Sequence, residues 1–347
     1  MRVLAFPAFA SRANNPYTSS LYDAIRRSRV SVHEYGAGAV LSRAYDILHV
    51  HWPEVPLNRG TFGSPLRARA FLTAIDLVRR RGAKLVWTVH NLRSHEQRFP
   101  RREADFFREF VARVDGFIAL SRSGERAVRE HHPALASRPS FVIPHHHYRG
   151  TYLDAVSRKE ARQQLRIGEH TRTLLFFGQI LGYKNVPTLI ATARELGPLP
   201  PTELVIAGRP KTPADAEALV AAAGGDPRIR LELGFVPPER AQLYFRAADL
   251  VVLPYREILN SGAAVLALSF DRPVLLPDLG ACRELGQQVG GNWVTTYDEL
   301  TSKALESALA RAAGLPERTD GSQLAKLDVT RAAERTIEAY EALLGQS

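Results

Sequence analysis

Residues 255–277 read YREILNSGAAVLALSFDRPVLLP, and this stretch indicates the fold class most clearly. It predicts a loop, then a helix over Ser261–Ser269 that starts with small residues, then a buried strand over Pro273–Leu276. In doubly wound α/β domains, such a helix points its N-terminus at the ligand, where N–H groups and the helix dipole favour a phosphate. The stretch has no GxGxxG motif, no Walker lysine and no carboxylate inside the helix. It therefore predicts an anion site built mainly from backbone N–H groups.

Apolar runs alternate with amphipathic segments along the rest of the chain. The expected strands are Arg2–Phe6, Asp46–His51, Lys84–His90, Asp115–Leu120, Ser140–Ile143, Arg172–Phe177, Thr202–Ala207, Ile229–Leu233, Leu250–Leu253, Pro273–Leu276 and Asn292–Thr295. The expected helices are Thr18–Arg27, Pro65–Arg81, Arg101–Arg113, Ser123–His131, Val186–Leu196, Pro213–Ala223, Pro237–Ala247, Ser261–Ser269, Tyr297–Ala313 and Val329–Leu344. Strand–helix alternation with apolar strands predicts mainly parallel sheets that helices cover on both faces. The fold class is therefore α/β, with two doubly wound Rossmann-like domains facing across a cleft.

The length of 347 residues suits two domains of ordinary size. The His-, Tyr- and Gly-rich segment after Pro144 marks the boundary between them. We expect an acceptor-side domain over 1–150, a donor domain over 151–327, and a C-terminal helix over 328–347 that packs back toward the first domain.

Composition and charge limit the classes of function. One cysteine, Cys282, excludes an internal disulfide and a cysteine-based metal site, and favours a cytoplasmic protein. Residues 1–150 hold 24 of the 46 Lys and Arg but 12 of the 36 Asp and Glu, a net charge of +12, whereas the remainder carries −2. This basic half indicates an anionic partner, or simply a chain that uses Arg on its surface. No basic patch interleaved with aromatic residues supports a nucleic-acid partner.

The strand ends of the second half carry the donor-side signals. Gly178 allows a close turn, and Lys184 just before a helix adds a cation to a phosphate site. Gly208 and Arg209 follow another strand. Phe235 and its neighbours give a loop able to hold a nucleobase. Asn260 or Ser261 suits the N-cap position, and Gly262 leaves the next N–H groups accessible.

Several segments in this order resemble the GT-B nucleotide-sugar glycosyltransferases, particularly family-4-like enzymes. They are FFGQILGYKN, LVIAGRP, LGFVPPE, YFRAADLVVLPY and SFDRPVLLPDLGACREL, with DILHVHW, VWTVHNLRSHE and DGFIALSRS in the first half. The resemblance covers most of the chain. It implies sugar transfer from a GDP- or UDP-linked donor to a hydroxyl acceptor such as a glycan, glycolipid or natural product. It also implies that the reaction needs no metal or other cofactor.

The resemblance assigns donor-side roles residue by residue. Lys184 would bind the diphosphate, Gln179 stands where an Arg is usual, and Phe235 and Val236 would border the base. Backbone groups of Asn260, Ser261 and Gly262 would contact the phosphates. The donor-binding residues expected are Gly178, Gln179, Lys184, Gly208, Arg209, Phe235, Val236, Glu257, Asn260, Ser261 and Gly262. His90 and Lys184 are the expected catalytic residues.

One departure from the family pattern affects the donor sugar. The usual pair of glutamates would fall on Ile258 and Leu266, and only Glu257 lies close enough to replace the first. The sugar, the base and the stereochemistry therefore stay open. A degenerate transferase, a nucleotide-sugar epimerase and, less well supported, a basic nucleic-acid-binding protein remain alternatives.

The first half contains the acceptor-side candidates. His90 closes an expected strand, where it would contact a sugar or act as a base, and Glu96 beside His95 is another candidate base. His49 and His51 alternate to one side of a strand but have no acidic pair, so we expect no metal. The acceptor-binding residues expected are Asn14, Asn15, Tyr17, His51, Trp52 and His95.

Two arginine-rich runs, Arg79–Arg81 and Arg101–Arg102, would suit anionic lipid headgroups. The partners expected are therefore a nucleotide-diphosphate sugar and a sugar- or lipid-linked acceptor, with contact to an anionic membrane. The expected location is the cytoplasm, at the inner face of the membrane.

Overall fold

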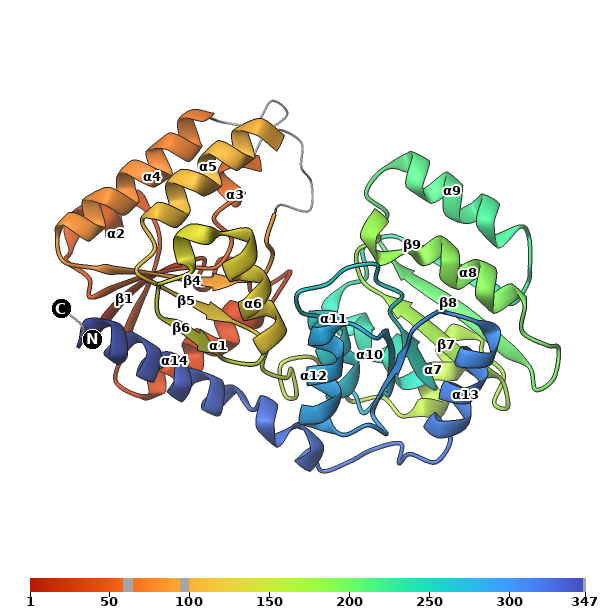
Figure 1. Cartoon of the computed structure of the whole chain (residues 1–347). Helices are drawn as coiled ribbons and strands as arrows, with labels where there is room; N and C mark the ends of the chain where they lie inside the picture. Colours follow the sequence, from red (N-terminus) through yellow and green to blue (C-terminus); the bar gives the residue numbers. More distant parts are fainter. Residues whose placement is uncertain (59–64, 94–99, 346–347) are drawn as a thin grey trace. The chain divides into compact units, whose positions relative to one another are not determined.

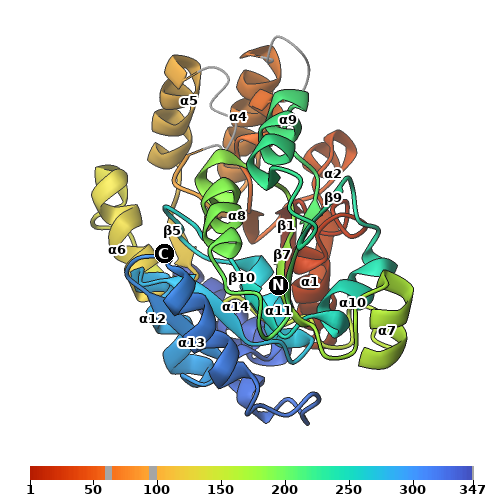
Figure 2. The ribbon, with the colours of Figure 1, turned by 90° about the vertical axis from the view of Figure 1, so that its right-hand side faces the viewer.

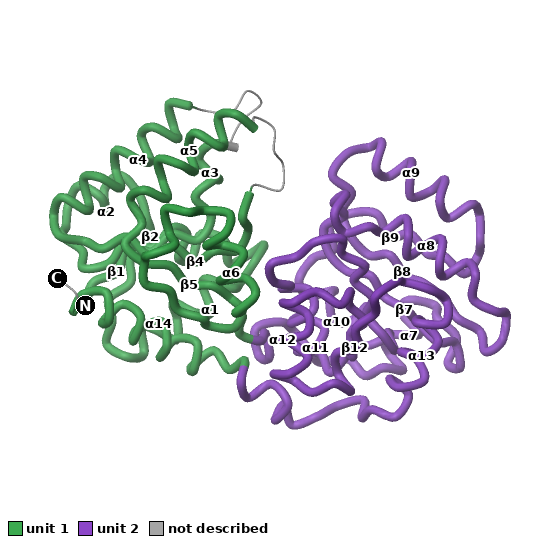
Figure 3. The backbone as a smooth tube through the Cα atoms, in the orientation of Figure 1, with its two compact units in different colours: residues 1–146, 327–347 green, residues 147–326 purple. Residues whose placement is uncertain are grey.

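The structure, a computed structural model, describes residues 1–58, 65–93 and 100–345. It contains two compact units: unit 1 comprises residues 1–146 and 327–347, and unit 2 comprises residues 147–326 (Figure 3). The units divide the chain after residues 146 and 326, where the sequence predicts boundaries after 150 and 327. The last helix, α14 (Val329–Leu344), packs on α1 (Tyr17–Arg27) within unit 1 (Figure 1).

Unit 1 is built on one parallel sheet in the order β2-β1-β3-β4-β5-β6. Its strands are β1 (Arg2–Phe6), β2 (Ser31–Glu34), β3 (Ile47–Val50), β4 (Lys84–Val89), β5 (Gly116–Ala119) and β6 (Ser140–Val142). Its other described helices are α2 (Ala37–Ser42), α3 (Val55–Asn58), α4 (Pro65–Arg80), α5 (Pro100–Ala112) and α6 (Arg122–His131), with a 3-10 turn at Pro133–Leu135. The helices α4 and α5 lie side by side, on the opposite side of the sheet from α1 and α14 (Figure 1).

Unit 2 is built on a second parallel sheet, in the order β12-β11-β10-β7-β8-β9. Its strands are β7 (Arg172–Phe177), β8 (Thr202–Gly208), β9 (Ile229–Leu233), β10 (Leu250–Val252), β11 (Val274–Pro277) and β12 (Val294–Tyr297). Its helices are α7 (Arg158–Leu165), α8 (Val186–Arg194), α9 (Pro213–Ala223), α10 (Pro238–Ala247), α11 (Gly262–Ser269), α12 (Gly280–Val289) and α13 (Ser302–Ala312), with 3-10 turns at Gly182–Lys184 and Ser322–Leu327. The helices α8 and α9 lie side by side (Figures 1 and 2), and α7 packs on α10.

The strand order reverses once in each sheet, and this positions the candidate sites. The central strands β3 and β5 are buried along their whole length, as expected for parallel strands covered on both faces. The order reverses between β1 and β3 in unit 1, and between β7 and β10 in unit 2. Ligands of doubly wound sheets bind beyond the carboxyl ends of the strands at such a switch point. The loops after these four strands therefore hold the candidate sites.

The α/β class with two doubly wound sheets is confirmed, but several elements differ from the sequence-based prediction. The helix predicted over Tyr297–Ala313 is wrong in its first turn, because Tyr297 ends β12 and α13 begins at Ser302, capped by Thr301. The edge strand β2 was not predicted, since only Val32 within it is buried. The helix α12 was not predicted either, because it begins with Gly280 and is largely polar.

Candidate functional site

The start of α11 lies on the loop that follows β10, at the switch point of unit 2. Ser261 is the N-cap, and its Oγ accepts a hydrogen bond from the Ala264 N–H at 3.0 Å. Gly262 and Ala263 occupy the first two helical positions, whose N–H groups have no carbonyl partner within the helix. The helix beyond them, Ala264–Ser269, is buried. The apolar sequence follows from this arrangement, because Ala264–Ser269 belong to the core and only the first turn of the helix offers backbone donors.

Lys184 lies on the loop that follows β7, the other strand of the switch point. It ends the 3-10 turn Gly182–Lys184, directly before α8. Burial lowers the pKa of its half-buried ammonium to about 8, so the group is cationic at neutral pH. An ammonium that is partly desolvated and near an N-terminal helix end favours an anionic ligand.

The two loops of the switch point are bonded to each other. The Arg256 N–H donates to the Tyr183 carbonyl at 2.8 Å, and the rings of Tyr183 and Tyr255 lie 6.1 Å apart. The buried Tyr255 hydroxyl lies 3.2 Å from the Ser261 Oγ. The residue before Lys184 and the N-cap of α11 are thus joined through Tyr255. Unit 2 therefore holds its ammonium loop and its helix start in a fixed relation.

Two glycines let the backbones after β7 and β8 meet. A Cβ on Gly208 would lie 1.9 Å from the Gly178 carbonyl oxygen, so no side chain fits there. Gly178 itself has a φ of +116°, a conformation that favours glycine, and a Cβ there would lie 3.7 Å from the Lys184 Nζ. The structure thus requires glycine at both positions. The sequence alone predicted only a close turn at Gly178.

The remaining donor-side candidates lie at the same carboxyl edge of the sheet. Phe235 follows β9 and is 62% exposed, an unusual state for a large aromatic side chain. Gln179, Arg209 and Glu257 are exposed, whereas Val236 and Asn260 are half-buried.

The position of the missing glutamate pair is visible in the structure. Leu266 is 6% exposed within the buried part of α11, and Ile258 is a half-buried loop residue. Burial raises the pKa of the Tyr183 hydroxyl to about 12, and the negative charge of Glu257 makes a smaller contribution. Glu257 therefore lies close to Tyr183. A carboxylate therefore does stand beside the Lys184 loop, one position earlier than the family pattern has it.

In unit 1, the loop after β1 is held by a carboxylate at the end of β2. The N–H groups of Ala8, Phe9 and Ala10 donate to Glu34 at distances of 2.6–3.1 Å. Asn15 accepts a hydrogen bond from the Tyr17 N–H at 3.1 Å, at the start of α1, while Asn14 is exposed. Asn15 thus has a local structural role, and Asn14 is the more accessible of the two.

His90 directly follows β4 and is packed among aromatic rings. The Trp52 ring, half-buried after β3, stacks on it at 4.6 Å with an interplanar angle of 24°. Tyr17 meets the His90 ring edge-on at 5.0 Å and stacks on His146 at 4.8 Å. The structure therefore brings Tyr17, Trp52, His51 and His90 together at the switch point of unit 1.

Burial keeps these histidines neutral. It lowers the pKa of His90 to about 3, with a smaller contribution from His49, and lowers that of His51 well below its usual value. A neutral imidazole with so low a pKa is a weak base, so hydrogen bonding suits His90 better than proton abstraction. His95 and Glu96 lie outside the described residues.

The structure adds groups that sequence reasoning missed. Glu54 follows Trp52, and burial raises its pKa to about 7, with a smaller contribution from Glu103. Tyr22 and Tyr340, from α1 and α14, both bond to His49 of β3, and Tyr22 also bonds to His51 just after it. Glu54 could have been found from the sequence, because it lies two residues after the candidate residue Trp52. No local feature of the sequence indicated Tyr22 or Tyr340.

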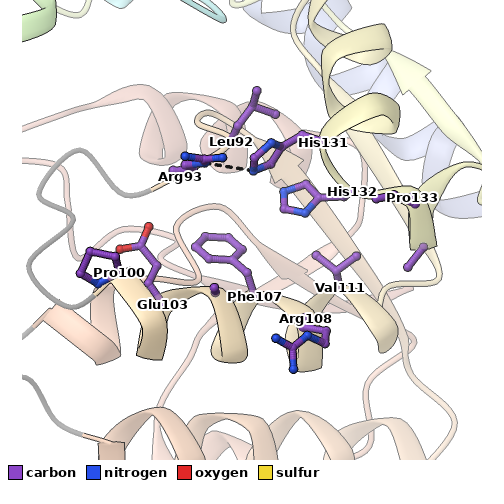
Figure 4. A pocket seen from close by; sticks show the side chains of 12 residues that line it. Leu92, Arg93, Pro100, Glu103, Phe107, Arg108, Val111, His131, His132 and Pro133 are labelled. Atoms are coloured by element: carbon purple, nitrogen blue, oxygen red, sulfur yellow. Dashed lines mark hydrogen bonds between the residues drawn. The ribbon is translucent and has the colours of Figure 1, made fainter.

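A hollow of about 490 Å³ lies beside α5 in unit 1 (Figure 4). Its lining includes the apolar Leu92 and Phe107, the cationic Arg93 and Arg108, and the carboxylate of Glu103. Arg93 donates from Nε to the His131 Nε2 at 3.4 Å. The lining thus carries charges of both signs beside apolar side chains.

The part of the chain that the structure describes holds neither a metal site nor a membrane-spanning helix. Among the described residues, no three His, Cys, Asp or Glu side chains are grouped as a metal site requires. Within residues 1–58, 65–93 and 100–345, no helix has the length and apolar character needed to cross a bilayer.

The sequence of the chain is similar to those of known glycosyltransferases. The family described as "Glycosyl transferases group 1" matches residues 157–320. A curated relative from Xanthomonas campestris pv. campestris is 31% identical over 338 residues, covering 96% of this chain and 89% of its own. That relative is named GDP-mannose:glycolipid 4-beta-D-mannosyltransferase.

Solved structures share the fold at low sequence identity. Sucrose-phosphate synthase from Thermosynechococcus elongatus has a TM-score of 0.64 at 16% identity, covering 100% of this chain and 97% of its own. Anabaena Alr3699/HepE in complex with UDP-glucose has a TM-score of 0.64 at 15% identity, covering 100% and 98%. These likenesses establish the two-domain GT-B architecture expected from the sequence.

Proposed function

The chain belongs to the group 1 glycosyl transferases, and from this premise we propose that it moves mannose from GDP-mannose to a hydroxyl group of a glycolipid. The name of the 31% identical relative supports the choice of donor and acceptor. The observation that carries the chemistry is the start of α11, where backbone N–H groups and the Lys184 loop flank the β7/β10 switch point. That arrangement suits the departing diphosphate of a nucleotide sugar.

The leaving group is stabilised by charge already in place. As the sugar–oxygen bond breaks, negative charge grows on the diphosphate, and fixed donors that face it lower the barrier. The N–H groups of Gly262 and Ala263 and the Lys184 ammonium supply such donors. We therefore propose that transfer is metal-independent. Phe235, 62% exposed at the same edge, is proposed to cover the guanine base.

The acceptor side is assigned to unit 1. Forming a β-mannoside from an α-linked nucleotide sugar inverts the anomeric carbon, and a single displacement of this kind needs a base for the acceptor hydroxyl. Glu54 is the proposed base, because its pKa of about 7 lies near the working pH. His90, neutral and beside Trp52, is proposed to hydrogen-bond a sugar hydroxyl.

A glycolipid acceptor implies contact with an anionic membrane at its cytoplasmic face. Of the Arg79–Arg81 run, Arg79 pairs with Asp115 at 2.9 Å and Arg81 donates to the Val40 carbonyl at 2.8 Å, so most of this run is engaged within unit 1. The starts of α4 and α5 combine exposed arginines with an exposed apolar side chain. There, Leu66 is 80% exposed and the exposed arginines are Arg67, Arg69, Arg101 and Arg102. Each basic residue near such a surface contributes about 1 kcal/mol.

Liposome co-sedimentation tests the membrane proposal. We expect the full chain to bind vesicles containing 30% phosphatidylglycerol but not neutral vesicles, with Arg101→Glu/Arg102→Glu largely unbound. The control Lys159→Glu/Lys303→Glu makes the same charge change at exposed positions of unit 2 and should bind like the parent. If both variants lost vesicle binding equally, the loss would reflect net charge alone and would contradict a specific role for the start of α5.

The function itself is tested by following transfer. Full-length protein is incubated with GDP-[14C]mannose and a bacterial glycolipid extract, and label in the lipid phase is measured, with UDP-glucose, ADP-glucose and dTDP-glucose in parallel. We expect label from GDP-mannose to enter the lipid phase. We also expect GDP to raise the melting temperature of the protein more than the other nucleotides do. Stabilisation by GDP without transfer would indicate a degenerate transferase, as the residues at Ile258 and Leu266 allow. Stabilisation by a different nucleotide alone would overturn the donor assignment.

A further inference from the structure

The end of α11 is bonded to both segments through which the chain passes between the two units. The first connecting segment, residues 147–152, begins unit 2. Its Tyr148 N–H donates to the Ser269 Oγ at 2.9 Å. Its Arg149 guanidinium donates to the Asp271 carboxylate. Ser269 is the last residue of α11, and Asp271 follows two positions later, so this segment is attached to the end of the helix.

The second connecting segment, residues 317–326, ends unit 2 and is bonded to the same turn. The Thr319 Oγ1 donates to the Asp271 Oδ1 at 2.6 Å. The Arg272 guanidinium, in the same turn, donates to the Glu317 carbonyl. One carboxylate, that of Asp271, therefore holds both connecting segments.

These contacts are buried and continuous with the helix. Ser269 is 6% exposed and Asp271 is 2% exposed. The Ser269 Oγ donates to the Val265 carbonyl at 2.6 Å, and the Asp271 N–H donates to the Leu268 carbonyl at 3.0 Å. Hydrogen bonds to a carboxylate are stronger away from water than at the surface. The turn that holds the connecting segments is therefore part of the helix and not a separate loop.

The other end of α11 carries the proposed diphosphate donors, the N–H groups of Gly262 and Ala263. The helix has only 8 residues, which is about two turns. So short a helix is not stable alone, because forming the first turn costs more than the few later bonds return. It forms only together with the groups that it packs on. We therefore expect it to open and close as a whole, so that a change at one end is felt at the other.

We propose that α11 and the two connecting segments open and close as one cooperative unit, so that a diphosphate bound at the first turn of α11 stabilises both connections between the units. A ligand that binds only the closed form shifts the opening equilibrium toward that form. The ligand rests on the proposed function, whereas the cooperative unit depends only on the contacts of Ser269 and Asp271. Donor binding would thereby regulate the freedom of both connections.

Hydrogen–deuterium exchange of the full-length protein, read by mass spectrometry of overlapping peptides, tests the unit without a ligand. Each part contains a hydrogen-bonded amide: Tyr148 in the first segment, Val265 in α11 and Leu324 in the second segment. In the parent protein these amides should share one opening free energy, with protection factors within about tenfold of one another. A wider spread would overturn the proposal, and this reading requires no variant to fold.

Ser261→Ala perturbs the unit from its first turn. It removes the cap bond to the Ala264 N–H and should speed exchange in both connecting segments about fivefold, the usual effect of a lost cap. Thr212→Ala is the matched control, because Thr212 caps α9, which packs on α8 and β9. It should leave the connecting segments unchanged. Unchanged exchange there in a folded Ser261→Ala protein, or an equal rise in both variants, would overturn the proposal.

A second arm adds GDP at about 100 times its dissociation constant. Exchange in α11 and in both connecting segments should slow together, by as much as about 100-fold. Protection of α11 without protection of the connecting segments would overturn the proposal. If GDP does not bind, that result counts against the proposed function, and the exchange of the ligand-free parent and Ser261→Ala proteins still decides whether the unit exists.

Discussion

Replacing Lys184 with Gln tests the diphosphate site most fully, because it removes the charge and keeps a polar side chain of similar reach. The ammonium is half-buried on the loop after β7, where water screens it less than at an exposed position. A hydrogen bond to a charged group contributes about 1.5–3 kcal/mol in such a setting. The dissociation constant for GDP should therefore rise about 10- to 150-fold, since 1.4 kcal/mol corresponds to a factor of ten.

The pH dependence gives the same prediction a second readout. With a pKa of about 8, the Lys184 side chain is mainly an ammonium at pH 7 and mainly a neutral amine at pH 9. The GDP affinity of the parent protein should therefore fall between pH 7 and pH 9, whereas that of Lys184→Gln should stay flat. Bound diphosphate stabilises the ammonium and raises its pKa, so the affinity starts to fall near the free-protein pKa of about 8 and levels off only above the raised pKa of the complex.

Isothermal titration of GDP into both proteins, at several pH values, measures these quantities. Lys159→Gln, which removes an exposed lysine on α7, is the control and should bind like the parent. A Lys184→Gln dissociation constant within twofold of the parent value at pH 7, with the same pH profile, would refute the reasoning.

Three further predictions concern single substitutions. Gly208→Ala should lower the melting temperature and GDP affinity together, because its Cβ would lie 1.9 Å from the Gly178 carbonyl oxygen; Gly234→Ala, with nothing within 4 Å, should do neither, and equal melting temperatures would contradict this. Glu54→Gln should lower kcat about 100-fold or more and remove a rise of kcat/KM with pH centred near 7, since the ionised form is the base; a retained rise would exclude it. Ser261→Ala removes the α11 cap and should cost about 1 kcal/mol in the free energy of unfolding, measured by urea titration.

The sequence was most informative where secondary structure follows from local pattern. The strands Arg2–Phe6 and Arg172–Phe177 were predicted with their observed bounds, because buried parallel strands are continuous apolar runs. Edge strands lack that signal, which is why Ser31–Glu34 was missed. The strand order, and with it the two switch points, was not available from pattern, since it depends on long-range pairing.

The candidate site divides in the same way. Ser261 and Gly262 were predicted because capping and helix starts are local features of sequence. The clash that forbids a side chain at Gly208 was not predictable, because the atom it would meet belongs to Gly178, which follows a different strand. The contact between His49 and Tyr340 joins residues 291 positions apart, and Glu54 owes its raised pKa to burial. Both depend on the folded chain.

A crystal structure of the full chain with GDP bound would show whether the start of α11 and Lys184 hold the diphosphate. We predict that the β-phosphate oxygens lie within hydrogen-bonding distance, about 2.7–3.2 Å, of the Gly262 and Ala263 nitrogens and of the Lys184 Nζ. A diphosphate bound elsewhere, with the first turn of α11 making no contact to it, would contradict the claim.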